Sequence, residues 1–175
     1  MARWTELSHI VKCLSYQSHI AVSGGERVRV EIVHASKYGN GKMVAEEIQR
    51  SMGSKGHQAF VHGFREVRPK ELPPADLYIF GTPARVGKPL GSMRRFIKKV
   101  SLPQGTRYAL FATHGAPQPN KKTGELPSPE EQERWYTSIP ILTEILSSKG
   151  LVKEADVRVF VKDLKGPLED GWQTK

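Results

Sequence analysis

The segment from residue 34 to residue 42, HASKYGNGK, has the residue types of a phosphate-binding loop. It supplies a serine hydroxyl, two glycines and two lysines, and it connects an apolar run that ends at Val33 to a helical pattern that starts at Asn40. Glycines let backbone amides approach a ligand closely, and the first amides of a helix carry partial positive charge. The segment therefore indicates an anion site, and its neighbours must show which phosphate compound it binds.

Three common phosphate-binding motifs do not fit this segment. A Walker A loop, Gly-x-x-x-x-Gly-Lys-Ser/Thr, would need a glycine in place of Ser36 and a hydroxyl in place of Met43. The dinucleotide fingerprint Gly-x-Gly-x-x-Gly would need a third glycine in place of Val44. A receiver-type regulator would need carboxylates where the chain has His34 and Gly81. Two readings remain: a loop that binds a monophosphate without a metal ion, and a tight turn that binds nothing.

Hydrophobic patterns place this loop in an alternation of strands and helices. The sequence predicts strands at 28–33, 59–62, 77–80, 108–112 and 157–161, and helices at 40–54, from Pro89 to Val100 and from Ser128 to Gly150. The last helix has the clearest start, because Ser128-Pro129-Glu130-Glu131 combines a capping box with proline at the first helical position. Pro140 is expected to kink or divide this helix.

Five strands that alternate with helices predict a three-layer α/β fold with a doubly wound parallel sheet. A barrel of this type would need eight such units. Ligands of doubly wound sheets bind beyond the carboxyl ends of the strands. Three loops lie at those ends here: residues 34–41, 82–88 and 113–122.

Together these three loops resemble those of the flavodoxin family. Residues 35–42 (ASKYGNGK) resemble the flavodoxin phosphate loop, residues 76–89 (DLYIFGTPARVGKP) look like the strand and loop beside the flavin, and residues 111–115 (FATHG) are similar to the third loop. The resemblance covers about residues 28–163 and implies the strand order 2-1-3-4-5 that is described for flavodoxin. It also implies that the chain binds FMN.

The resemblance assigns the FMN site residue by residue. The phosphate is expected on Ser36, Lys37, Tyr38, Gly39, Asn40 and Gly41, and the isoalloxazine ring between two sets of residues: Thr82, Pro83, Ala84, Arg85, Val86 and Gly87, and Thr113, His114 and Gly115. His114 is the candidate catalytic residue, because an imidazole in a loop that faces the ring can hydrogen-bond to it or protonate it. A structural histidine is the alternative. No spacing of histidines indicates a metal site, and the one cysteine excludes a cysteine cluster.

The chain departs from the flavodoxin pattern in three places. Tyr38 and Gly41 stand where flavodoxins usually have hydroxyl residues, so FMN affinity is expected to be modest. The 82–88 loop has no tryptophan or tyrosine to stack on the ring. Flavodoxins usually have a fifth helix after the last strand, whereas this chain stops shortly after 166–172. We therefore expect residues 5–22, or a partner subunit of a homo-oligomer, to cover the sheet face that remains.

Charge and composition complete the interpretation. The formal net charge of +9 favours an acidic redox partner protein. Nucleic acid is not the expected partner, because the aromatic residue of the basic cluster 94–99, Phe96, belongs to the core-facing stripe of its helix. No stretch approaches the roughly 20 apolar residues of a membrane span, and no secretory signal is expected. The single cysteine is typical of a cytoplasmic protein.

We therefore expect residues 1–26 to be an N-terminal extension and residues 27–175 to be a flavodoxin-like FMN-binding domain. The leading interpretation is a cytoplasmic redox protein that transfers electrons through FMN. One alternative is a flavodoxin-like oxidoreductase of the quinone reductase or protoporphyrinogen oxidase type. The other is an interaction domain that keeps the fold without the flavin.

Overall fold

The structure, a computed structural model of the chain, describes residues 27–162, 166–170 and 172. The expected N-terminal extension, residues 1–26, lies outside the described residues, so the division at residue 27 stays a prediction. Every helix that is described is too short or too polar to cross a membrane.

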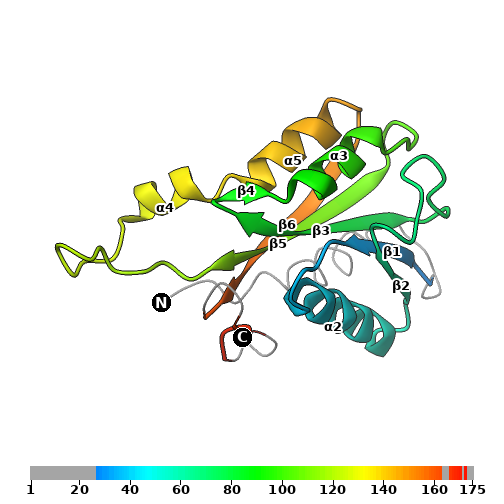
Figure 1. The fold of residues 1–175 in the computed structure, drawn as a ribbon. Helices are drawn as coiled ribbons and strands as arrows, with labels where there is room; N and C mark the ends of the chain where they lie inside the picture. The colour runs from blue at the N-terminus through cyan, green and yellow to red at the C-terminus, as the bar shows by residue number, and fades with distance from the viewer. Residues whose placement is uncertain (1–26, 163–165, 171, 173–175) are drawn as a thin grey trace.

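A parallel sheet forms the middle layer of the fold (Figure 1). Its strands are β1 (Arg29–His34), β2 (Gln58–Gly63), β3 (Leu77–Arg85), β5 (Arg107–Gly115) and β6 (Val152–Val161). They lie in the order β2-β1-β3-β5-β6, and the two-residue strand β4 (Lys88–Pro89) pairs antiparallel with the end of β3. Counted along the parallel strands alone, the order is 2-1-3-4-5, which confirms the predicted topology.

Helices cover both faces of this sheet (Figure 1). Helix α2 (Asn40–Ser54) packs on one face, and helices α3 (Gly91–Lys99) and α5 (Ser138–Ser147) pack on the other. Successive residues of a strand point to opposite faces, so Ile79 lies in the core under α2 while Phe80 lies in the core under α3 and α5. This two-sided burial explains the continuous apolar runs of the central strands.

Two predicted strands extend further at their carboxyl ends than expected, and this changes the site. Strand β3 continues to Arg85 and β5 to Gly115, so residues that were expected in loops extend the sheet instead. Their pairing is parallel, with Pro83 opposite Thr113. The predicted helix start at Pro89 was wrong, because Pro89 pairs with Ala84 in β4 and α3 begins two residues later.

The last predicted helix is divided, but not at Pro140. Helix α4 (Pro129–Trp135) ends before Tyr136, and α5 starts at Ser138. Pro140 is the third residue of α5, where its missing N–H costs no hydrogen bond because the first turn has no acceptor for it. The capping box at Ser128 is confirmed, with its serine hydroxyl accepting from the N–H of Glu131.

Part of the sheet face beside α2 is covered by residues that follow β6, which the sequence did not indicate. Leu168 and Trp172 are buried in the same cluster as α2 and the valines of β6. Leu168 also forms an antiparallel bridge with Val161. The chain after β6 thus folds back on the sheet without forming a helix among the described residues. Residues 5–22, the expected cover, lie outside them, and a covering partner subunit stays a prediction.

Candidate functional site

The predicted phosphate loop connects β1 to α2 at the carboxyl edge of the sheet. The N–H of Ala35 donates to the carbonyl of Gly81 at 2.9 Å, which extends the pairing of β1 with β3 into the loop. Gly41 packs directly against this segment, since a Cβ on it would lie 2.7 Å from the carbonyl oxygen of Ala35. Glycine at position 41, where relatives usually have a hydroxyl residue, is therefore required by the close approach of α2 to its own loop.

The N-terminus of α2 offers hydrogen-bond donors that the described residues leave unused. Its N-cap is Gly39, at φ 92°, and neither a side-chain cap nor an acidic residue is present in the first turn. The first bond of the helix runs from the N–H of Met43 to the carbonyl of Gly39 at 3.0 Å. For the N–H groups of residues 36–42, no acceptor is found among the described residues. The Oγ of Ser36 is buried beside them, also without a partner there.

Three side chains of this loop already contact other groups of the protein. The Asn40 amide donates to the carbonyl of Gly166 at 2.9 Å and so links the loop to the C-terminal segment. The Lys42 ammonium lies 3.6 Å from the Glu46 carboxylate one turn along α2, so the Lys42 side chain lies along the side of the helix. The ammonium of Lys37 lies 5.2 Å from the centre of the exposed Tyr38 ring. The donors that remain for an anion are the loop amides, the Ser36 hydroxyl and the exposed side chain of Lys37.

The second predicted loop is a tight β-hairpin. Arg85 pairs with Lys88, so Val86 and Gly87 are the two turn residues, at φ 49° and 72°. Positive φ at both positions is the signature of a type I′ turn. Glycine adopts this conformation freely, whereas a β-branched valine adopts it only under strain. At the base of the hairpin, Thr82 Oγ1 accepts a hydrogen bond from the N–H of Leu90 at 3.1 Å.

The hairpin tip is fixed to the junction between α4 and α5. The carbonyl of Gly87 accepts hydrogen bonds from Thr137 Oγ1 at 3.2 Å and from Ser138 Oγ at 2.9 Å. Gly87 also lies against the backbone of Trp135. Sequence reasoning missed this junction, because no pattern pairs Gly87 with a segment about 50 residues further along the chain. These contacts hold the 82–88 hairpin against the junction between α4 and α5.

The structure corrects the expectation for His114. His114 lies within β5, not in a loop, and only 2% of its surface is exposed. Its ring meets the Tyr136 ring edge-on, with centroids 4.7 Å apart, and Phe160 lies on another side at 6.3 Å. Burial, with a smaller contribution from the positive charge of Arg158, lowers the pKa of His114 to about 4. His114 therefore lies in the core rather than in an open loop, its buried Nε2 has no hydrogen-bond partner among the described residues, and its catalytic role stays a prediction.

The remaining predicted residues are brought to the same edge. Because β1, β3 and β5 are adjacent and parallel, their carboxyl ends carry the Ser36–Gly41 loop, the hairpin and the Thr113–Gly115 segment side by side (Figure 1). Thr113 is buried and Gly115 is exposed at the end of β5. No cluster of three metal-ligating side chains is found in the part of the chain that the structure describes.

Comparison with known proteins identifies this arrangement. Residues 32–115, which include all three segments, match the flavodoxin family model. The match supports a flavodoxin-family domain over this part of the chain. No curated protein matches the sequence.

Solved structures share this fold. A flavodoxin from the domain Archaea has a TM-score of 0.57 and 22% identity, covering 78% of this chain and 87% of its own. The flavodoxin of Streptococcus pneumonia TIGR4 has a TM-score of 0.57 and 16% identity, covering 83% and 90%. The rubredoxin oxygen:oxidoreductase of Desulfovibrio gigas has a TM-score of 0.56 and 18% identity, covering 83% of this chain but 32% of its own. At such identities the likeness is one of fold.

Proposed function

We propose that the chain binds FMN and transfers electrons through it. The observation that carries this proposal is the set of unused donors at the start of α2, where the amides of residues 36–42 and the buried Ser36 Oγ have no acceptor among the described residues. A buried polar atom without a partner is costly, so the Ser36 Oγ beside free helix amides favours a ligand that supplies acceptors. A phosphate monoester has three such oxygens and negative charge, which the helix dipole also favours.

The residues of the site have distinct roles in this proposal. The Ser36 hydroxyl and the loop amides bind the phosphate, and Lys37 adds positive charge beside it. Gly41 lets α2 approach the loop closely enough for its first amides to point at the phosphate. The hairpin and Gly115 border the ring, and the bonds to Gly87 hold the hairpin in place. Bound FMN supplies the redox chemistry, since its ring accepts and releases electrons.

Titration of the purified full-length chain with FMN tests the proposal through quenching of flavin fluorescence. The informative variant is Ser36→Ala, which removes one charge-assisted hydrogen bond and is expected to weaken FMN binding about tenfold. Ser101→Ala is the matched control, because Ser101 is exposed and lies between α3 and the amino end of β5, whereas the three loops lie at the carboxyl ends of the strands. Riboflavin lacks the phosphate, so its binding should not change in Ser36→Ala. Absence of FMN binding to the natural chain, or equal binding by both variants, contradicts the proposal.

We further propose an acidic protein as the redox partner. Lys37, Arg85 and Lys121 belong to the three loops at the site edge, and none forms an ion pair with a described residue. Electrostatic attraction would then raise the rate of encounter, and the rate would fall as salt is added. Stopped-flow reduction by an acidic ferredoxin, compared with a basic donor protein, measures this. Faster reaction with the basic donor contradicts the proposal.

A separate measurement distinguishes a carrier from an enzyme. The FMN-loaded chain is mixed with NAD(P)H and a quinone, and oxidation of the nicotinamide is followed by absorbance. A carrier is expected to show little turnover without its protein partner, whereas an oxidoreductase turns over by itself.

A further inference from the structure

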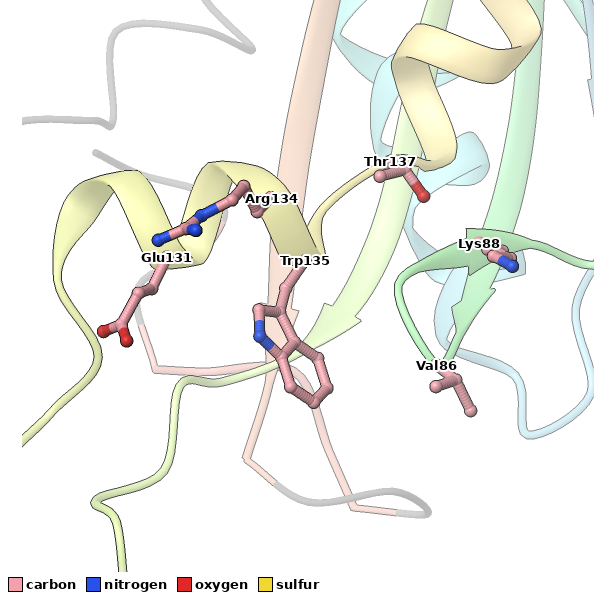
Figure 2. Close-up of a pocket in the computed structure, with 6 residues that line it drawn as sticks. All are labelled: Val86, Lys88, Glu131, Arg134, Trp135 and Thr137. Carbon is pink, nitrogen blue, oxygen red and sulfur yellow. The ribbon is translucent and has the colours of Figure 1, made fainter.

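We propose that the hollow between the hairpin tip and helix α4 binds a small planar organic anion at a site separate from the flavin. Figure 2 shows this hollow, which measures about 390 Å³ and is lined by Val86, Lys88, Glu131, Arg134, Trp135 and Thr137. Its size falls within the range of small-molecule sites. The inference goes beyond the proposed function, because it does not require FMN to be bound.

Both walls of the hollow are fixed before any ligand arrives. The Gly87 carbonyl, with its two hydroxyl donors, fastens the hairpin wall to the start of α5. The α4 wall begins at the capping box of Ser128, and the Glu133 carboxylate of α4 forms a two-pronged ion pair with Arg158 of β6, at 2.6 and 2.9 Å. A preformed site avoids much of the ordering cost of binding.

The apolar part of the hollow suits a flat ring. Trp135 is 64% exposed and Val86 is 82% exposed, although the backbones of both are held in place. Figure 2 shows the indole and the valine side chain extending from opposite walls toward the same open end. Exposed indole surface gains free energy when an aromatic ring stacks on it, and the face of the indole is flat and rigid.

The charged groups select a negative ligand. Lys88 stands on the hairpin wall and Arg134 on the α4 wall, and neither forms an ion pair with a described residue. Glu131 is the one carboxylate of the lining, and its Oε2 accepts from the N–H of Ser128 at 2.8 Å. The Thr137 hydroxyl already donates to Gly87. The lining therefore has a net charge of +1, which favours an aromatic ring that carries a carboxylate or sulfonate.

The hollow is distinct from the predicted flavin site, although the two share the hairpin tip. None of its lining residues belongs to the phosphate loop or to the Thr113–Gly115 segment. Val86 is the residue that both sites include, so a ligand in the hollow would lie beside the flavin site without replacing the flavin.

Isothermal titration calorimetry with anthraquinone-2-sulfonate tests the inference on the full-length chain, both without FMN and saturated with it. One molecule is expected to bind under either condition. Arg134→Gln and Lys88→Gln should each weaken binding about fivefold, and Trp135→Ala about tenfold. The matched control is Lys121→Gln, which removes the same charge from a neighbouring loop outside the lining. Thermal unfolding of each variant verifies that it folds, and Trp135→Phe, which keeps an aromatic ring, should recover part of the affinity.

Three results would overturn the inference. They are absence of binding, equal weakening in Lys121→Gln, and displacement of the sulfonate by FMN, which would place it in the flavin site. A fourth such result is tighter binding of the neutral 2-(hydroxymethyl)anthraquinone, which would remove the role of charge. Failure of the proposed function gives a different result, because FMN would then not bind while the sulfonate still does.

Discussion

Gly87 lies so close to the backbone of Trp135 that a Cβ added to it would stand 1.7 Å from the Trp135 carbonyl oxygen. This contact joins the tip of the hairpin to the end of α4, two segments that lie far apart in the sequence. Glycine is required at this position for two reasons, since its φ of 72° also lies in the left-handed region.

Gly87→Ala is expected to destabilise the fold by about 3 kcal/mol, since it combines a backbone penalty with a steric clash. Gly105→Ala isolates the first cost, because Gly105 has a φ of 79° and open space where its Cβ would be. That control should lose about 1 kcal/mol. Urea denaturation measures both losses. Equal losses would show that the Trp135 contact contributes nothing.

At Val86 the natural residue is itself strained, so a suitable substitution is expected to stabilise the fold. Asparagine tolerates positive φ and Asn-Gly is the favoured pair in a type I′ turn, so Val86→Asn is expected to raise stability by about 1 kcal/mol. Little burial is lost, since the side chain is largely exposed. Val86→Ala removes the same apolar surface but keeps most of the backbone penalty, so it should bring less gain. Thermal unfolding of the natural chain and of the two variants measures this. An unchanged melting temperature in Val86→Asn would argue against strain at this residue.

The burial of the central strands could be predicted because they are apolar on both faces, whereas their order followed from the resemblance to flavodoxins. Helix α2 was predicted with its observed bounds, since Gly39 and Asn40 mark its start and Val44, Ile48 and Met52 repeat on one face. Strand ends were less predictable. Pro83 and Thr113 have the composition of loop residues, yet they extend the sheet, because their backbones pair across it.

The site was predictable to the extent that it follows from strand order. Three loops at the carboxyl ends of adjacent strands must meet at one edge, whatever their sequences. The support of the hairpin could not be predicted, because a hydrogen bond from Ser138 to Gly87 depends on tertiary packing and leaves no local pattern. His114 was misplaced for the same reason: its type is compatible with a loop, but Tyr136 and Phe160 enclose it.

Gly81 and Phe111 form a second close contact that can be tested. A Cβ on Gly81 would lie 2.0 Å from the Cζ of Phe111, so the aromatic ring of β5 occupies the space that a side chain of β3 would need. Gly81→Ala is expected to lose about 3 kcal/mol through overpacking. Leucine is smaller than phenylalanine and leaves room for the new methyl group. The double variant Gly81→Ala/Phe111→Leu should therefore lose less unfolding free energy than the sum of the two single variants. Additive losses in urea denaturation would contradict this contact.

His114 gives the fold a pH dependence whose sign follows from its burial. Its pKa is about 4 in the folded chain and about 6.5 when unfolded, so the unfolded chain binds more protons between these values. The contribution of neutral His114 is therefore fully present above about pH 6.5 and is lost as the pH falls toward 4, by at most about 1.4 kcal/mol per pH unit. His114→Phe should flatten the unfolding free energy between pH 5 and 7 relative to the natural chain. An NMR titration of His114 with a midpoint near 6.5 would contradict the prediction, as would an unchanged pH slope in the variant.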